Sequence, residues 1–108
     1  MSAYMDLNDG PASGNRWLLH DVLRDAWNFK GFVVSDANAV SSLITHGYAR
    51  DGQDATYKAF SAGLNMDMAS GTYLKFLAAE VGAGRISSQQ IDAAVRPILE
   101  NQDSAGIV

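Results

Sequence analysis

The sequence alternates short apolar runs with longer segments of helical periodicity, and this alternation constrains the fold more than any other feature. The runs cover residues 31–36 and 64–68, and residues 1–4 form a third run that is entered partway along. Continuous apolar runs of this length predict buried strands. Each pair of runs is separated by enough chain for a crossover helix, so we expect parallel strands with right-handed connections. The predicted class is α/β, in the order β, α, β, α, β, α.

The segments between and after these runs carry helix signals. Their apolar spacing predicts helices over residues 17–27, 38–46, 51–62, 73–81 and 87–99. Asn15 is placed to cap the first of them, and Ser87 with Gln90 has the spacing of a capping box for the last. Pro97 stands inside that last helix, where it removes one backbone hydrogen bond, so we expect a kink or a break there.

Composition argues against several function classes. The 108 residues include 12 acidic and 8 basic side chains, a net charge of -4 without a basic cluster, so neither nucleic acid nor a membrane surface is an expected partner. No apolar run approaches the ~18 residues of a membrane span, and the N-terminal residues lack the blocks of a signal peptide. With no cysteine and only His20 and His46, which we expect on the surface or in loops, we predict no metal site and no cofactor.

Two groups of motifs carry more information than hydrophobic periodicity and composition do. The first group is Ser2-Ala3-Tyr4, Gly31-Phe32 and Val34-Ser35-Asp36, and the second is Ala62-Gly63-Leu64-Asn65-Met66-Asp67-Met68 with Ile91-Asp92-Ala93-Ala94-Val95-Arg96. In this order they resemble glycoside hydrolase family three, the β-glucosidase family, over nearly the whole chain. The resemblance implies the last three β/α units of a TIM-type (β/α)8 barrel. Residues 1–108 would then be a partial barrel, a C-terminal fragment of the catalytic barrel domain, since a complete barrel needs about 250 residues.

The resemblance assigns the chemistry to Asp36. In this family the Asp of a Ser-Asp pair at the carboxyl end of the strand is the catalytic nucleophile, and Asp36 occupies that place. A retaining glycosidase needs one ionised carboxylate to attack the anomeric carbon and a second carboxyl about 5 to 5.5 Å away to protonate the leaving oxygen. Tyr4 matches a family tyrosine on the adjacent strand, where its hydroxyl is expected to bind the carboxylate and the substrate site. The implied activity is retaining hydrolysis of terminal β-D-glucosyl bonds in a β-glucoside or oligosaccharide.

Each of these residues also has a structural interpretation. Asp36 has the position of a cap for the helix that begins near Asn38, and Tyr4 that of a core aromatic at a strand end. Within residues 65–68 two methionines alternate with two polar residues, so one pair is expected to face the helices and the other the opposite side of the sheet. Filling the core is the default expectation for the methionines.

The chain also departs from the family pattern and lacks some of its parts. Ala37 stands where many members have a bulky residue after the nucleophile, and Asn65 replaces a frequent Asp. The family's acid/base usually lies in another domain, and its other sugar-binding residues lie on earlier strands. The resemblance therefore implies two partners, the rest of the barrel and a second domain, and an isolated fragment that is inactive. It also implies a periplasmic or secreted parent protein.

Two other function classes are open on the residues alone. A three-stranded piece leaves two strand edges open, which fits a non-catalytic structural fragment that self-associates or pairs with the rest of a barrel. A small doubly wound nucleotide-binding domain is disfavoured, because no glycine-rich phosphate loop joins a strand to a helix. The size of the chain in solution and its hydrolysis of an aryl β-glucoside discriminate among these classes.

Overall fold

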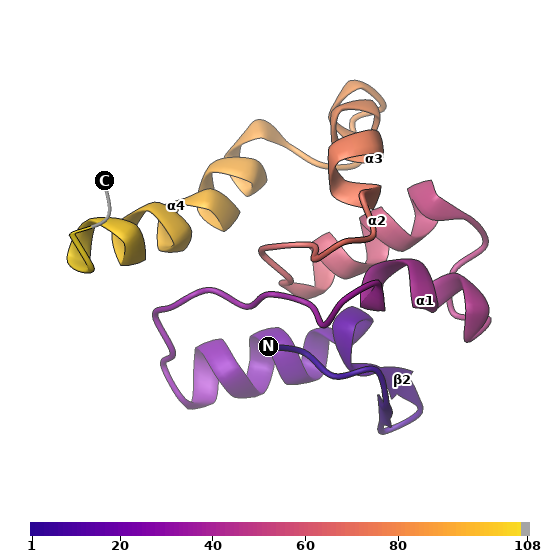
Figure 1. Cartoon of the computed structure of the whole chain (residues 1–108), viewed down its shortest axis with the longest axis horizontal. Coiled ribbons are helices and arrows are strands. Elements are labelled where there is room, and N and C mark those ends of the chain that lie inside the picture. The colour runs from indigo at the N-terminus through magenta and orange to yellow at the C-terminus, as the bar shows by residue number, and fades with distance from the viewer. Residues whose placement is uncertain (107–108) are drawn as a thin grey trace.

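The computed structural model describes residues 1–106, which form an α-rich chain with a small sheet (Figure 1). In chain order the elements are β1 (Asp6–Leu7), β2 (Gly10–Pro11), the 3-10 helix η1 (Ala12–Gly14), the π-helix η2 (Trp17–Ala26), α1 (Ala39–Thr45), α2 (Gly52–Ala62), α3 (Thr72–Gly82) and α4 (Ser88–Ser104). The hairpin β1–β2 turns through Asn8 and Asp9, which both have positive φ, as a tight hairpin turn requires.

The three apolar runs lie side by side in chain order and are parallel. Ser2 bridges Ser35, and Val34 bridges Met66, so the run 31–36 lies between the other two. The predicted order and direction are confirmed, but the predicted length is wrong, because the pairing consists of isolated bridges rather than full strands. One reason is local: the Val33 amide donates to the Asn65 side chain at 2.9 Å instead of to a backbone carbonyl, which interrupts the ladder.

The helices cover one face of these three runs. Val33 and Leu64 point into a buried cluster that α1, α2 and η2 complete, with Leu19, Val40, Leu43, Ala49, Ala55, Ala59 and Ala62 as its other members. The alanines of α2 leave room for that helix to lie close against the runs, as their small side chains predict. No comparable cluster of buried hydrophobic residues covers the other face among residues 1–106.

Local helix signals are mostly confirmed. The Asn15 side chain accepts from the Leu18 amide at 3.1 Å, and Ser87 and Gln90 form the predicted capping box. The predicted break at Pro97 is wrong, because α4 continues through it to Ser104. The residue four positions before Pro97 is the exposed Ala93, so water can reach the carbonyl that loses its partner, which lowers the cost of a proline inside the helix.

The helix after Asn15 differs in type from the amphipathic α-helix that the spacing predicts. It is a π-helix over ten residues, and its C-terminal bond runs from the Trp27 amide to the Val22 carbonyl, five residues back, at 2.9 Å. Hydrogen bonds between residues five apart change which side chains share a face.

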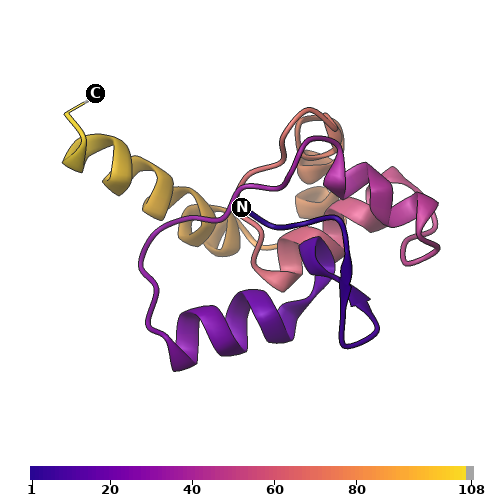
Figure 2. The ribbon, with the colours of Figure 1, turned by 60° about the horizontal axis from the view of Figure 1, so that its bottom comes forward.

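Helix α4 extends away from the body of the chain in both ribbon views (Figures 1 and 2). None of its residues is buried, and one contact that ties it to the body is the 2.9 Å bond from Asn65 Nδ2 to the Ala94 carbonyl. Within residues 1–106, no helix combines the length and the apolar character that crossing a membrane takes.

Candidate active site at the end of the middle run

Asp36 ends the middle run on the face that the helices leave uncovered. Side chains alternate along an extended run, so Val33 and Ser35 face the helices while Val34 and Asp36 face the other way. The Asp36 amide donates to the Ser2 carbonyl at 3.1 Å, which fixes the backbone of this residue beside the first run. The Asp36 side chain is half-buried.

The carboxylate of Asp36 does not cap the following helix. Its Oδ1 accepts from the adjacent Ala37 amide at 2.8 Å, whereas α1 begins at Ala39, and its N-cap residue Asn38 makes no side-chain cap bond. The structural interpretation of Asp36 as a helix cap is therefore not supported. Because one short local bond leaves acceptor capacity on the second oxygen, the carboxylate is free to meet another group.

Tyr4 lies next to this carboxylate, on the neighbouring run. Its hydroxyl donates to the Ala37 carbonyl, one residue beyond the acceptor that the sequence suggested. Partial loss of water around the phenol and, next, the negative charge of Asp36 raise the pKa of Tyr4 above its ordinary value. The hydroxyl therefore keeps its proton at neutral pH. At 44% exposure the ring is not the core aromatic of the alternative interpretation.

A bulge in the third run decides which residues join this face. The amides of Asn65 and Met66 both donate to the Val33 carbonyl, at 3.0 and 3.1 Å, so two residues oppose one. The extra residue reverses the alternation after the buried Leu64. Met66 and Met68 consequently lie on the open face at 37% and 40% exposure, so the expectation that the methionines fill the core is wrong.

Asn65 holds this bulge in place through three hydrogen bonds. Its Oδ1 accepts from the Val33 amide at 2.9 Å and from Arg24 Nη2 at 3.0 Å, and its Nδ2 donates to the Ala94 carbonyl at 2.9 Å. The side chain thus links the middle run, η2 and α4. Burial lowers the pKa of Arg24, but an arginine this far from titration keeps its charge at neutral pH.

The second polar residue of this run also faces the helices, as the alternation predicts. Asp67 Oδ2 accepts from the Thr72 amide and hydroxyl, both at 2.9 Å, and from the Tyr73 amide at 3.2 Å. These bonds satisfy the first amides of α3. They also leave the loop after residue 68 anchored at the same end of the runs as Asp36.

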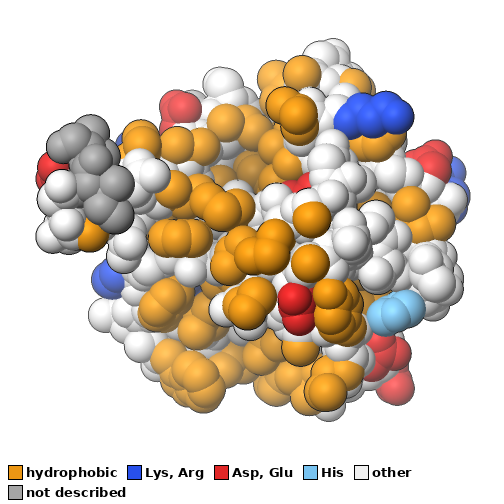
Figure 3. All heavy atoms as spheres, viewed as in Figure 1, with side chains coloured by type: hydrophobic (Ala, Val, Ile, Leu, Met, Phe, Trp, Pro, Cys, Tyr) orange, Lys and Arg blue, Asp and Glu red, His pale blue; other side chains and the backbone are white. Residues whose placement is uncertain are grey.

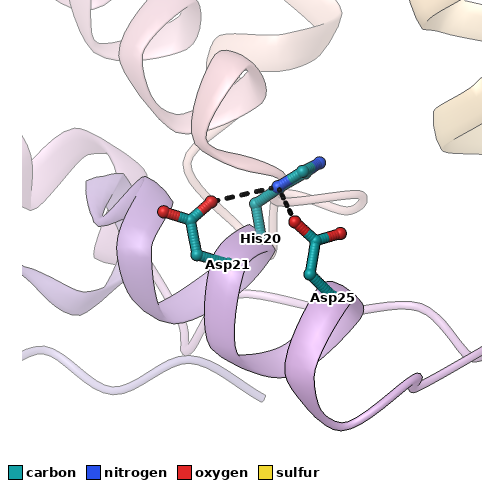
Figure 4. Close-up of side chains that lie close together, drawn as sticks. All are labelled: His20, Asp21 and Asp25. Atoms are coloured by element: carbon teal, nitrogen blue, oxygen red, sulfur yellow. Dashed lines mark hydrogen bonds and ion pairs between the residues drawn. The ribbon is translucent and has the colours of Figure 1, made fainter.

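His20, Asp21 and Asp25 form a separate cluster on η2 (Figure 4). His20 Nδ1 lies 3.2 Å from Asp21 Oδ1 and 3.6 Å from Asp25 Oδ2. The π-helix brings Asp25 onto the face of His20, five residues earlier. Among residues 1–106 this is the group whose atoms could together approach a metal ion, yet the histidine and carboxylates already partner one another. His46 is exposed at the end of α1.

An apolar groove of about 440 Å³ lies between the first run and η2, away from Asp36. It is lined by large apolar side chains, among them Met5, Leu18, Val22, Trp27 and Phe29. Figure 3 shows hydrophobic side chains gathered across the middle of one face of the molecule. Because the groove contains neither Asp36 nor Tyr4, it is a different feature from the candidate site.

Known proteins match the chain over most of its length. The chain is 42% identical over 107 residues to the periplasmic β-glucosidase of Salmonella typhimurium, covering 99% of this chain and 14% of that protein. It is 36% identical over 107 residues to a xylan 1,4-β-xylosidase of Xylanibacter ruminicola, covering 98% of this chain and 12% of that protein. A crystal structure of β-glucosidase from Listeria innocua with isofagomine superposes with a TM-score of 0.87 at 34% identity, over 90% of this chain and 14% of that one.

The chain therefore spans about one seventh of the length of these relatives. The family model described as "Glycosyl hydrolase family 3 N terminal domain" matches residues 1–100. The family, the shared fold and the motif order agree with one another. The chain belongs to glycosyl hydrolase family 3.

Proposed function

We propose that this chain is the part of a retaining β-glucosidase that supplies the nucleophile Asp36. The observation that carries the proposal is the position of Asp36, at the end of the middle parallel run, on the open face and beside Tyr4. Active sites of parallel α/β barrels lie at the carboxyl ends of their strands. In the proposal, residues 1–108 are the last three β/α units of the barrel, and the open face is its interior.

The proposed reaction is a double displacement. An Asp36 oxygen attacks the anomeric carbon, the bond to the leaving oxygen breaks, and a proton from a second carboxyl neutralises that oxygen. Water then attacks the anomeric carbon of the glycosyl ester, loses its proton to the second carboxyl, and the ester bond to Asp36 breaks. The products are glucose and an alcohol, and the carboxylate is restored.

Tyr4 keeps its proton in this reaction and acts as a donor. Its raised pKa keeps the proton on the hydroxyl, which in the reaction turns from the Ala37 carbonyl to donate to the carboxylate or to a sugar oxygen. A donor beside Asp36 favours the ionised carboxylate, which is the form that attacks. We therefore include Tyr4 among the substrate-binding residues.

The proposed partners follow from what the chain does not contain. The substrate is a β-glucoside or an oligosaccharide, and the rest of the barrel and a second domain with the acid/base complete the site. Relatives that are named β-xylosidases make a xylosyl substrate the alternative within the same reaction. We also propose a periplasmic or secreted location for the whole protein, on the basis of the similarity to a periplasmic β-glucosidase.

A non-catalytic role for the isolated chain is the second proposal. The groove of about 440 Å³ and the open edges of the outer runs leave apolar surface and backbone groups without cover. Such surfaces favour association with the rest of a barrel or with a second copy. This proposal concerns the separate molecule and is compatible with the nucleophile assignment in the whole protein.

Covalent trapping tests the catalytic proposal. The whole protein is incubated with a 2-fluoro-glucosyl substrate that forms the ester faster than water breaks it, and the labelled peptide is located by mass spectrometry. We expect the label on Asp36, and we expect Asp36→Asn to lose the label and nearly all turnover. A label on another residue contradicts the proposal. Asp25→Asn, an exposed carboxylate on η2, is the matched control and keeps both.

A further inference from the structure

We propose that Met68 is a specificity-determining residue whose thioether packs against the sugar ring attacked by Asp36. This inference rests on the proposed function, because it names a substrate contact of the same site. It starts from the bulge, which sends the methionines of the third run to the open face instead of into the helix-covered core. The two methionines lie at different positions along this run, and only one of them is beside Asp36.

The register of the middle and third runs places Met68, rather than Met66, beside Asp36. Bridge partners lie opposite one another with side chains on the same face, and Val34 is the partner of Met66. Asp36 and Met68 each follow two residues later, about 6.6 Å further along their runs. Met68 is therefore level with Asp36 on the adjacent run, roughly 4.8 Å away between backbones, whereas Met66 lies one layer deeper.

Backbone contacts hold Met68 at this level. Its amide donates to Ser35 Oγ at 2.9 Å, and its carbonyl accepts from the Asn38 amide at 2.9 Å. Ser35 directly precedes Asp36 and Asn38 follows it by two residues, so the nucleophile and Met68 are positioned by the same short segment. A shift of one would move the other.

The chemistry of the thioether fits the apolar part of a sugar. A carboxylate that attacks the anomeric carbon must have the sugar ring directly in front of it, and a side chain level with that carboxylate on the next run meets the same ring. Met68 is 40% exposed, so its apolar atoms are available to a ligand. Burying them against the carbon–hydrogen face of the ring removes apolar surface of both groups from water. An unbranched, polarizable side chain adapts to such a surface.

Steady-state kinetics of the whole protein test this inference. Met68→Ala is expected to raise KM about tenfold while kcat changes less, because the contact is made with the bound sugar before and during reaction. Met68→Leu, which keeps the volume, stays within a few-fold of the parent. Met66→Ala is the matched control: the same residue type on the same face, one layer lower, with KM unchanged.

Two substrates that share the glucosyl ring but differ in the leaving group test which part of the substrate Met68 contacts. The rise in KM is expected to be equal for 4-nitrophenyl and methyl β-glucosides, because both present the same ring. A rise for the nitrophenyl substrate alone would place Met68 against the leaving group and overturn the inference. An unchanged KM in Met68→Ala, or an equal rise in Met66→Ala, would also overturn it.

Two further measurements keep the test decisive. Should Met68→Ala fail to fold, Met68→Gln keeps a similar length but replaces the thioether with a polar amide, and we expect the same rise in KM. Fluorosugar labelling of the variants shows which proposal has failed. A label on Asp36 with KM unchanged rejects only the role of Met68, whereas a label on another residue rejects the nucleophile assignment.

Discussion

Removal of the Asn65 side chain should loosen the middle run, because this side chain ties the run to two helices. Asn65→Ala deletes three hydrogen bonds at 2.9, 3.0 and 2.9 Å, which join the middle run, η2 and α4. A neutral protein hydrogen bond contributes about 1 kcal/mol and one to a charged group about 1.5 to 3. Because Asn65 and Arg24 are only half-buried, we take the low end, about 3 kcal/mol in total.

Amide hydrogen exchange measures this local effect in a large protein. The Val33 amide donates to Asn65, so its exchange reports the loss directly. A loss of about 3 kcal/mol corresponds to roughly 10²-fold faster exchange for peptides that contain Val33, since 1.4 kcal/mol is a factor of ten. Peptides from α3, which makes no hydrogen bond to the Asn65 side chain, serve as the internal reference.

A conservative variant sharpens the test. Asn65→Asp keeps the acceptor for Val33 and gives Arg24 an ionised partner, but it cannot donate to the Ala94 carbonyl. It should cost about 1 kcal/mol, so exchange at Val33 should rise only about fivefold. Equal exchange in the parent and Asn65→Ala would refute the reasoning. An Asp variant as mobile as the Ala variant would also refute it, because the shared acceptor bonds would then contribute nothing.

Three further predictions concern the buried Tyr73, the uncovered surfaces of the isolated chain and its missing acid/base. Burial and then the charge of Asp67 raise the pKa of Tyr73 well above its ordinary value, so the folded state holds this proton more tightly than the unfolded state. Stability should therefore fall as pH rises above about 10, by up to ~1.4 kcal/mol per pH unit, and denaturation at about pH 9 and 11 should show a smaller loss in Tyr73→Phe. The isolated chain should sediment as an assembly or melt without cooperativity, because its groove and strand edges are uncovered; a compact monomer with a sharp transition would contradict this. The same chain should not hydrolyse 4-nitrophenyl β-glucoside, since general acid catalysis alone typically contributes ~10² to 10⁴ in rate, and turnover by the purified chain would count against a missing acid/base.

Local signals in the sequence were sufficient wherever an element depends on its own neighbours. The capping box at Ser87 and Gln90 and the cap at Asn15 are confirmed, because a cap needs only a side chain and amides two or three residues away. The parallel order of the three runs was also predictable, since each crossover segment leaves few topologies open. The family resemblance, confirmed by the match over residues 1–100, is likewise a property of the residue order.

The features that sequence reasoning missed depend on contacts between distant segments. Pro97 remains inside a continuous helix, because the cost of a lost bond depends on whether water reaches the freed carbonyl, which the fold decides. His20 and Asp25 share a face only because η2 is a π-helix.

The direction of the methionines is the clearest case. Alternation in the sequence separates them from Asn65 and Asp67 but does not say which pair faces the helices. The choice is made by the bulge, in which two amides share the Val33 carbonyl while the Asn65 side chain takes the Val33 amide, 32 residues away in the chain. The order of the residues indicates the family, but the pairing between distant runs places Met68 level with Asp36. Local pattern cannot predict this, because a one-residue shift in pairing turns every following side chain to the other face.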